Sequence, residues 1–228
     1  MKNRETQPPV ELQGDPARQA MPLLRGVDYQ IWQTVVAWID LAENEMLVVE
    51  GAEDFDVISE TKAIGNQVKN LAAPISLRSV CVCEALRNFW TIRHKNPSRQ
   101  IGLRLITTAN LSFEAGFPFG ASQLGLEIWN NETTLKSPKH SQLLKEFLVS
   151  DVSVSKRLAK PFDDGIPSLI EHLRQLSPDL FHVEFIQRIQ WLSKQPDVDV
   201  IREMVRVKLR AYGESKNLLA RDSERASS

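Results

Sequence analysis

Three short apolar segments between residues 46 and 69 constrain the fold more than any other feature of the chain. They are separated by Gly51 and by the polar link Glu60-Thr61-Lys62. Apolar runs of this length between turn residues are typical of β-strands. We therefore expect three consecutive strands, at Met46–Glu50, Phe55–Ser59 and Ala63–Lys69.

Amphipathic segments with helical spacing lie on both sides of these strands. The first covers about residues 28–43, with apolar residues on one face at Tyr29, Trp32, Val36 and Ile39. The second covers about residues 76–94, with Val80, Cys83, Leu86 and Trp90 facing inward, and a further strand follows at Ile101–Thr108. The order helix, three strands, helix, strand predicts an α/β fold in which helices flank a mixed sheet.

The chain from Asn110 onward has a different character. Helical patterns recur at Ser141–Val149, Ile166–Leu176 and Asp197–Tyr212, whereas Phe181–Leu192 is compatible with either a strand or a helix. We expect four regions: a flexible, proline-rich leader (1–25), a sheet core (26–130), a mostly helical extension (131–213) and a polar tail (214–228). The extension either packs on the core or mediates assembly.

The composition is that of an ordinary globular protein. The 228 residues are 42% hydrophobic and 25% charged, with a formal net charge of −1. These values exclude a mainly disordered or collagen-like chain and argue against a strongly cationic nucleic-acid coat protein. No apolar run approaches the roughly 20 residues of a membrane helix. We expect a soluble, cytoplasmic protein.

The chemistry of the predicted hairpin centres on acidic residues next to a glutamine and a lysine. Side chains two apart on a strand share a face, so Asp54 can point with Asp56, and Gln67 with Lys69. Mg²⁺ and Mn²⁺ bind carboxylate and carbonyl oxygens. A lysine beside such a cation can orient water and stabilise charge that develops on a phosphate. The pattern indicates metal-assisted hydrolysis of a phosphodiester.

These residues resemble the motif of the PD-(D/E)XK restriction-endonuclease-like nucleases. Gln67-Val68-Lys69 is similar to the Mrr-type branch, in which glutamine replaces the second acidic residue. The resemblance implies that Asp56 is the main metal ligand, that Gln67 completes the metal shell through its carbonyl oxygen, and that Lys69 positions the attacking water. Glu50 or Asp54 would supply a further ligand, and the sequence leaves that choice open.

A wider resemblance covers roughly Gly26 to Trp129. Glu84–Trp90, Asn96-Pro97 and Leu105–Ala109 are similar to effector nuclease domains of bacterial antiphage defence systems. This implies DNA as substrate and control by oligomerisation or by an ATPase or sensor partner, such as a STAND NTPase, an SMC-like ATPase or a cyclic-nucleotide sensor. The chain has no G-x4-G-K-[S/T] phosphate loop, so an NTPase would be a separate protein or another part of a longer one.

Other interpretations remain open. The acidic cluster could simply be solvated, and Lys69 could protect a strand edge, although that role does not explain Gln67 on the same face. The basic residues of the last helix, Arg202, Arg206 and Arg210, could contact phosphates, solvent or a partner. The main alternative is a catalytically silent, nuclease-like module that binds nucleic acid or scaffolds a partner ATPase; a purely structural helical adaptor comes last.

Overall fold

A computed structural model describes residues 20–162 and 165–215 of the chain. Helix α1 (Ala20–Ile39) leads into three strands, β1 (Met46–Val49), β2 (Phe55–Ile58) and β3 (Lys62–Lys69). Helix α2 (Val80–Lys95) connects β3 to strand β4 (Gln100–Thr107). The later elements are α3 (Gly125–Leu135), α4 (Pro138–Ser150), α5 (Val152–Leu158), α6 (Leu169–Gln175), α7 (Pro178–Phe181), the π-helical turn η2 (His182–Ile186), β5 (Ile189–Leu192) and α8 (Val198–Ser215).

The five strands form one mixed sheet in the order β1-β2-β3-β4-β5. β2 pairs antiparallel with both β1 and β3, whereas β3 and β5 each pair parallel with β4. Short turns can join antiparallel neighbours, but parallel neighbours need a crossover, and α2 is the crossover between β3 and β4. The predicted α/β class is confirmed: helices flank a mixed sheet and the C-terminal region is mostly helical.

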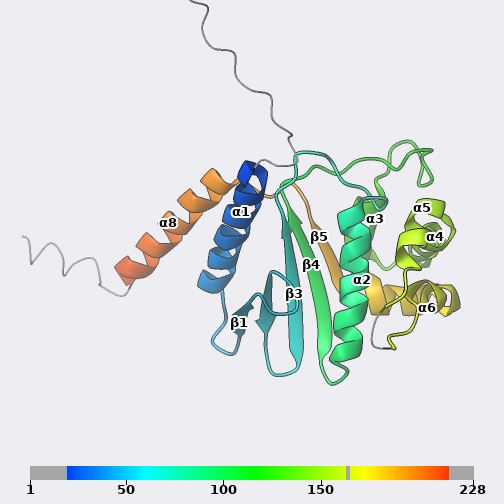
Figure 1. Ribbon diagram of the computed structural model, residues 1–228, viewed down its shortest axis with the longest axis horizontal. Helices are drawn as coiled ribbons and strands as arrows, with labels where there is room; N and C mark the ends of the chain where they lie inside the picture. Colours follow the sequence, from blue (N-terminus) through cyan, green and yellow to red (C-terminus); the bar gives the residue numbers. More distant parts are fainter. Residues whose placement is uncertain (1–19, 163–164, 216–228) are drawn as a thin grey trace, which may run out of the picture.

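The larger hydrophobic core lies between the sheet and α2 and continues among the helices from α3 to α7 (Figure 1). Helical spacing predicted the buried stripe of α2 at Cys83, Leu86 and Trp90, each at most 2% exposed. Val80 was expected to face inward as well, but it is 54% exposed. As the first residue of α2, it lies beyond the part of the helix that packs on the sheet.

A smaller core covers the opposite face of the sheet, where α1 and α8 lie together (Figure 1). Its buried residues are Tyr29, Phe55, Val68, Ile106, Ile201 and Val205. An ion pair of 2.6 Å between Arg202 Nη2 and Asp28 Oδ2 joins the two helices. Arg202 is therefore engaged within the fold, whereas Arg206 pairs with Glu203 of its own helix at 3.4 Å.

Three differences from the sequence expectation change the organisation of the chain. Helix α1 begins at Ala20, so residues 20–25 of the expected leader are helical. The ambiguous segment 181–192 ends α7, forms the π-helical turn and then becomes strand β5. Because β5 pairs with β4, the region expected as a helical extension also contributes a strand to the sheet.

Parts of the expected leader and tail, residues 1–19 and 216–228, lie outside the described residues. Within the described part, no helix has both the length and the apolar character needed to cross a membrane.

The junction of α4 and α5 gives a test of how the helical region is held. Asp151 accepts hydrogen bonds from the backbone N–H groups of Ser153 and Val154 at 3.1 and 3.0 Å and pairs with Arg78 Nη2 at 2.7 Å. We expect Asp151→Ala to lower the free energy of unfolding by about 1–3 kcal/mol, because it removes a helix cap and leaves Arg78 unpaired. Urea denaturation measures this loss.

The pKa of Asp151 determines how this loss of stability depends on pH. Partial burial raises the pKa of Asp151, but the hydrogen bonds from Arg78, Val154 and Ser153 outweigh it and lower the pKa from 3.8 to about 2. The stabilisation is therefore complete above pH 3.8 and is lost as the pH falls through about 2. The control is Asp199→Ala, because Asp199 is 85% exposed. An equal loss in both variants would contradict the interpretation.

Candidate functional site

The hairpin of β2 and β3 brings three of the predicted site residues to one face of the sheet. Asp56 lies directly opposite Gly65, and directly paired residues point to the same side. Gln67 and Lys69 follow Gly65 at steps of two, so they share that face. The β4 residues paired with Gly65 and Gln67 belong to the larger core, which identifies this face as the one that α2 covers.

Asp56 is held rigidly at the centre of the hairpin. Its side chain is buried, and Oδ2 accepts a hydrogen bond of 2.7 Å from the backbone N–H of Ala52. The other oxygen, Oδ1, is buried and accepts no hydrogen bond from any residue that the structure describes. One carboxylate oxygen therefore fixes the orientation of the group, and the second remains available for a ligand.

Gln67 and Lys69 continue the same face toward the end of β3. Gln67 is buried, and its carbonyl oxygen Oε1 has no hydrogen-bond donor in the described part of the chain. Lys69 is half-buried. Burial raises the pKa of both Glu53 and Asp54, and the charge of Lys69 offsets part of that rise. The predicted lysine thus lies in the electrostatic field of the acidic cluster.

Asp54 and Glu50, the alternative ligands, lie at the rim of the hairpin. Asp54 Oδ2 accepts a hydrogen bond of 2.6 Å from the backbone N–H of Val68, beyond the last paired residue of β2. Burial raises the pKa of Asp54, although the Val68 bond and Lys69 lower it in part. Glu50 is exposed, and its Oε1 accepts a bond of 3.0 Å from Gln30 Nε2 of α1.

Glu53 belongs to the site although the sequence motif did not select it. Its Oε1 is buried and has no hydrogen-bond donor within residues 20–162 and 165–215. Its pKa is raised from 4.5 to about 7. Burial is the main cause and the charges of Asp54 and Asp56 add to it, whereas the Asn88 side chain and Lys69 oppose the rise in part. Asn88 lies on α2, so the crossover helix contributes a polar side chain to the cluster.

Two glycines provide the space that the acidic side chains occupy. A Cβ at Gly51 would lie 2.2 Å from Asp56 Oδ2, which is closer than atoms can approach. A Cβ at Gly65 would lie 2.9 Å from Glu53 Cγ and 3.4 Å from Asp56 Oδ1. Glycine at both positions thus allows two carboxylates to lie against the strand backbone.

The donor set of this hairpin fits a hard divalent cation. Three of the five buried side-chain atoms that lack a hydrogen-bond partner in the described residues are oxygens of this hairpin: Glu53 Oε1, Asp56 Oδ1 and Gln67 Oε1. An unsatisfied buried polar atom costs about 1–3 kcal/mol. Carboxylate and amide oxygens are the ligands that Mg²⁺ uses, so one cation could satisfy atoms that otherwise have no partner.

Histidine, cysteine and carboxylate groups alone do not form a metal site. In residues 20–162 and 165–215, no group of three or more such side chains is arranged to hold a metal ion. A cation at the hairpin would therefore depend on the amide oxygen of Gln67 as well as on carboxylates.

No protein-family model, curated protein or solved structure matches the chain.

The raised pKa of Glu53 predicts an unusual pH dependence of stability. Because the folded pKa of about 7 exceeds the ordinary 4.5, the folded state binds this proton more tightly, and stability falls as the pH rises from 4.5 through 7. Glu53→Gln should remove this fall and stabilise the metal-free protein by about 1–2 kcal/mol at about pH 8, after allowance for solvent screening. Urea denaturation in EDTA across this range measures the difference.

Glu43→Gln is the matched control, since Glu43 is exposed in the turn between α1 and β1. Its stability should follow the wild-type pH profile. Parallel profiles for Glu53→Gln and the wild type would show that Glu53 is not buried among like charges.

Proposed function

We propose that the chain is a metal-dependent DNA endonuclease of the PD-(D/E)XK type and acts as the effector of an antiphage defence system. The observation that carries the proposal is the group of buried oxygens without a described hydrogen-bond partner on the β2–β3 hairpin and on Glu53 in the turn before it. Asp56 and Gln67 of this group share one face of the sheet with Lys69. Carboxylate, amide oxygen and lysine together match the donor set needed for metal-assisted phosphodiester hydrolysis.

Each residue has a distinct role in this proposal. Asp56 would hold the metal through Oδ1, because Oδ2 is engaged by the N–H of Ala52. Gln67 would add its Oε1, and Glu53 is a further candidate ligand once it is deprotonated. Bound Mg²⁺ or Mn²⁺ would supply Lewis acidity toward the phosphate and activate water. Lys69 would position that water and stabilise negative charge on the phosphate.

Asp54 and Glu50 would have supporting roles. One carboxylate oxygen of Asp54 accepts a hydrogen bond from the Val68 N–H, and the other could bind a metal ion or contact Lys69. Glu50 is engaged by Gln30, so it would have to exchange that hydrogen bond to bind the metal. We therefore rank Asp54 above Glu50 as the additional ligand.

Electrostatics explains why a cation would be needed. Four acidic residues lie within seven positions of the hairpin, and carboxylates repel phosphate. A divalent cation reverses this local charge and allows a DNA backbone to approach. Uncontrolled cleavage would harm the host cell, so the proposal includes control by oligomerisation or by a partner ATPase or sensor subunit.

A specific observation favours the second candidate function, a silent module that binds nucleic acid or scaffolds an ATPase. Gln67 supplies a neutral oxygen where a carboxylate would attract the metal more strongly. Such a module would bind DNA and leave it intact under every metal condition.

Substitution of the central residues tests the activity. We expect Asp56→Ala and Lys69→Ala each to reduce Mg²⁺- or Mn²⁺-dependent nicking of plasmid DNA by at least about 100-fold, because each removes a group that acts on the reacting phosphate. EDTA should abolish nicking by the wild type. Circular dichroism should show that both variants are folded.

The control is Lys156→Ala, which removes an exposed lysine of α5. It should nick DNA like the wild type. Because the proposed activity is gated, Mg²⁺ binding is measured in parallel by calorimetry, and Asp56→Ala should lose it. The proposal would be contradicted if nicking survives both substitutions, or if the wild type binds no Mg²⁺ at the hairpin.

Gly51 offers a test that leaves every proposed ligand in the sequence. Gly51→Ala puts a methyl group where Asp56 Oδ2 lies, so it should displace the carboxylate and lower Mg²⁺ affinity by about tenfold or more. Calorimetry with Mg²⁺ measures the change. Gly26→Ala is the control, because a Cβ there meets nothing within 4 Å. Unchanged affinity in Gly51→Ala would argue against Asp56 as a ligand.

A further inference from the structure

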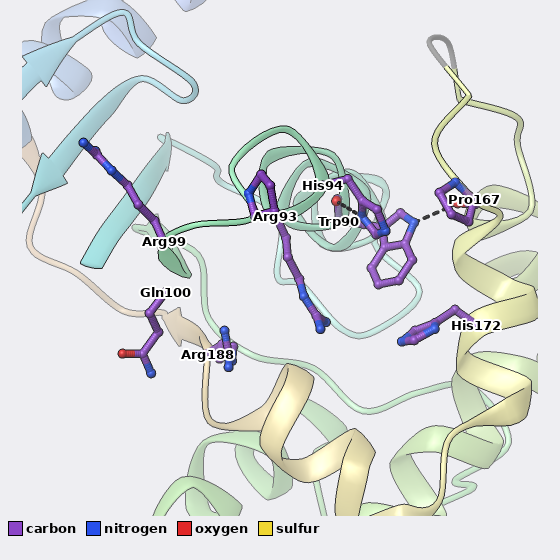
Figure 2. Close-up of a pocket in the computed structure, with 9 residues that line it drawn as sticks. Trp90, Arg93, His94, Arg99, Gln100, Pro167, His172 and Arg188 are labelled. Carbon is purple, nitrogen blue, oxygen red and sulfur yellow. Dashed lines mark hydrogen bonds between the residues drawn. The ribbon is translucent and has the colours of Figure 1, made fainter. Parts of the chain in front are cut away.

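A second concave site lies outside the acidic hairpin. A cavity of about 680 Å³ opens at the C-terminal end of α2, beside the start of β4 (Figure 2). Residues from four parts of the chain line it: the last turn of α2, the turn into β4, α6 with the segment before it, and the residue that precedes β5. Its volume is in the range of pockets that bind small molecules.

The lining of this cavity is strongly basic. It includes Arg93, Arg99 and Arg188 together with two histidines, and none of its described lining residues is acidic. Glu184 is the carboxylate that contacts the lining, at 2.6 Å from Arg93 Nη1 and 3.0 Å from His172 Nε2. Of the three arginines, Arg93 is paired with this carboxylate. Among the described lining residues and Glu184, this leaves an excess of two positive charges with the histidines neutral.

The two inner arginines face the cavity in a fixed arrangement. In Figure 2, the guanidinium of Arg93 lies between Arg188 and the ring of His172, whereas Arg99 extends away along the rim. Arg188 Nε donates a hydrogen bond of 3.2 Å to the carbonyl oxygen of Val183. This bond does not involve the Nη groups of Arg188, which could therefore bind a ligand. Burial and the nearby charge of Arg93 lower the pKa of Arg188, as expected where cations meet without full compensation.

The aromatic wall of the cavity is rigid. Trp90 is 2% exposed, and its Nε1 donates a hydrogen bond of 2.8 Å to the carbonyl of Pro167. The rings of His94 and His172 pack on it at centroid distances of 4.1 and 4.4 Å. A wall that is already ordered loses little entropy when a ligand binds, so this cavity is preformed.

The positive charge continues beyond this cavity. A smaller neighbouring cavity of about 80 Å³ shares Gln100 and Arg188 with it and adds Lys62 and Arg104 to the lining. Arg104 is held by Gln190 Oε1 at 2.9 Å. Cations therefore line both cavities, with Arg188 at the junction.

We infer that this cavity binds the phosphate groups of a nucleotide or of a nucleic-acid strand. Arginine forks match the geometry of phosphate oxygens. Arg188 and Arg99 have no carboxylate partner among the described residues, so their donors could bind a polyvalent anion. The inference is independent of the proposed nuclease activity, because it uses neither the acidic hairpin nor a metal ion.

Binding measured in EDTA tests the inference without contribution from the hairpin. The probes are inorganic pyrophosphate, ATP and a 5′-phosphorylated single-stranded DNA oligonucleotide, each titrated by calorimetry. We expect Arg188→Gln to weaken the probe that binds by about tenfold or more, and affinity to fall as salt is raised. Arg99→Gln, at the exposed rim, should weaken binding less and provides a second variant if Arg188→Gln proves unstable in a thermal melt.

Arg174→Gln is the matched control, since Arg174 is an exposed arginine of α6 outside the cavity lining. It should bind like the wild type, and so should Asp56→Ala, which separates this site from the hairpin. Binding of pyrophosphate and ATP would identify a free nucleotide as the source of the phosphate, and binding of the oligonucleotide alone would identify a strand. The inference is overturned if no probe binds, or if the cavity variants bind as tightly as the wild type.

Discussion

The parallel pairing of β3 with β4 is the constraint on which both sites depend. A parallel pair cannot be closed by a short turn, so the chain must return across the sheet, and α2 is the segment that does so. Its apolar stripe closes the larger core. Its polar positions are thereby fixed as well: Asn88 lies against the acidic hairpin, and Arg93 lines the basic cavity. Five residues along a helix correspond to about 7 Å of axial rise, so one rigid element couples two regions of opposite charge.

The formal net charge of −1 conceals a separation of positive and negative charge within the molecule. The balance does not reflect a uniformly mixed surface, because acidic groups gather at the β2–β3 hairpin and cationic groups gather at the C-terminal end of α2. Bringing like charges together in each region costs free energy, and the pKa values show it. Burial and the nearby carboxylates raise the pKa of Glu53, and burial together with the charge of Arg93 lowers the pKa of Arg188. Such strain is common where a protein is organised to bind a ligand rather than for maximal stability.

The sequence predicted the hairpin well because strand periodicity and turn residues are local signals. Alternation along β3 correctly placed Gln67 and Lys69 on one face, opposite the strand that carries Asp56. Glu53 was missed as a site residue because it lies in a turn, where no period defines the direction of a side chain. Asn88 was missed because its position depends on how α2 packs, which is a tertiary property. The segment 181–192 was ambiguous for a real reason, since it combines a π-helical turn with a strand.

The pairing of α1 with α8 has a consequence for how the chain reaches its native state. Asp28 and Arg202 are 174 residues apart, yet their ion pair joins the helices that cover one face of the sheet. That face, with Phe55 and Val68, can be closed only after the last described helix has been synthesised. During translation the sheet would therefore expose an apolar surface until a late stage. High contact order of this kind slows folding and favours aggregation of intermediates, so chaperone dependence would be concentrated on this side of the molecule.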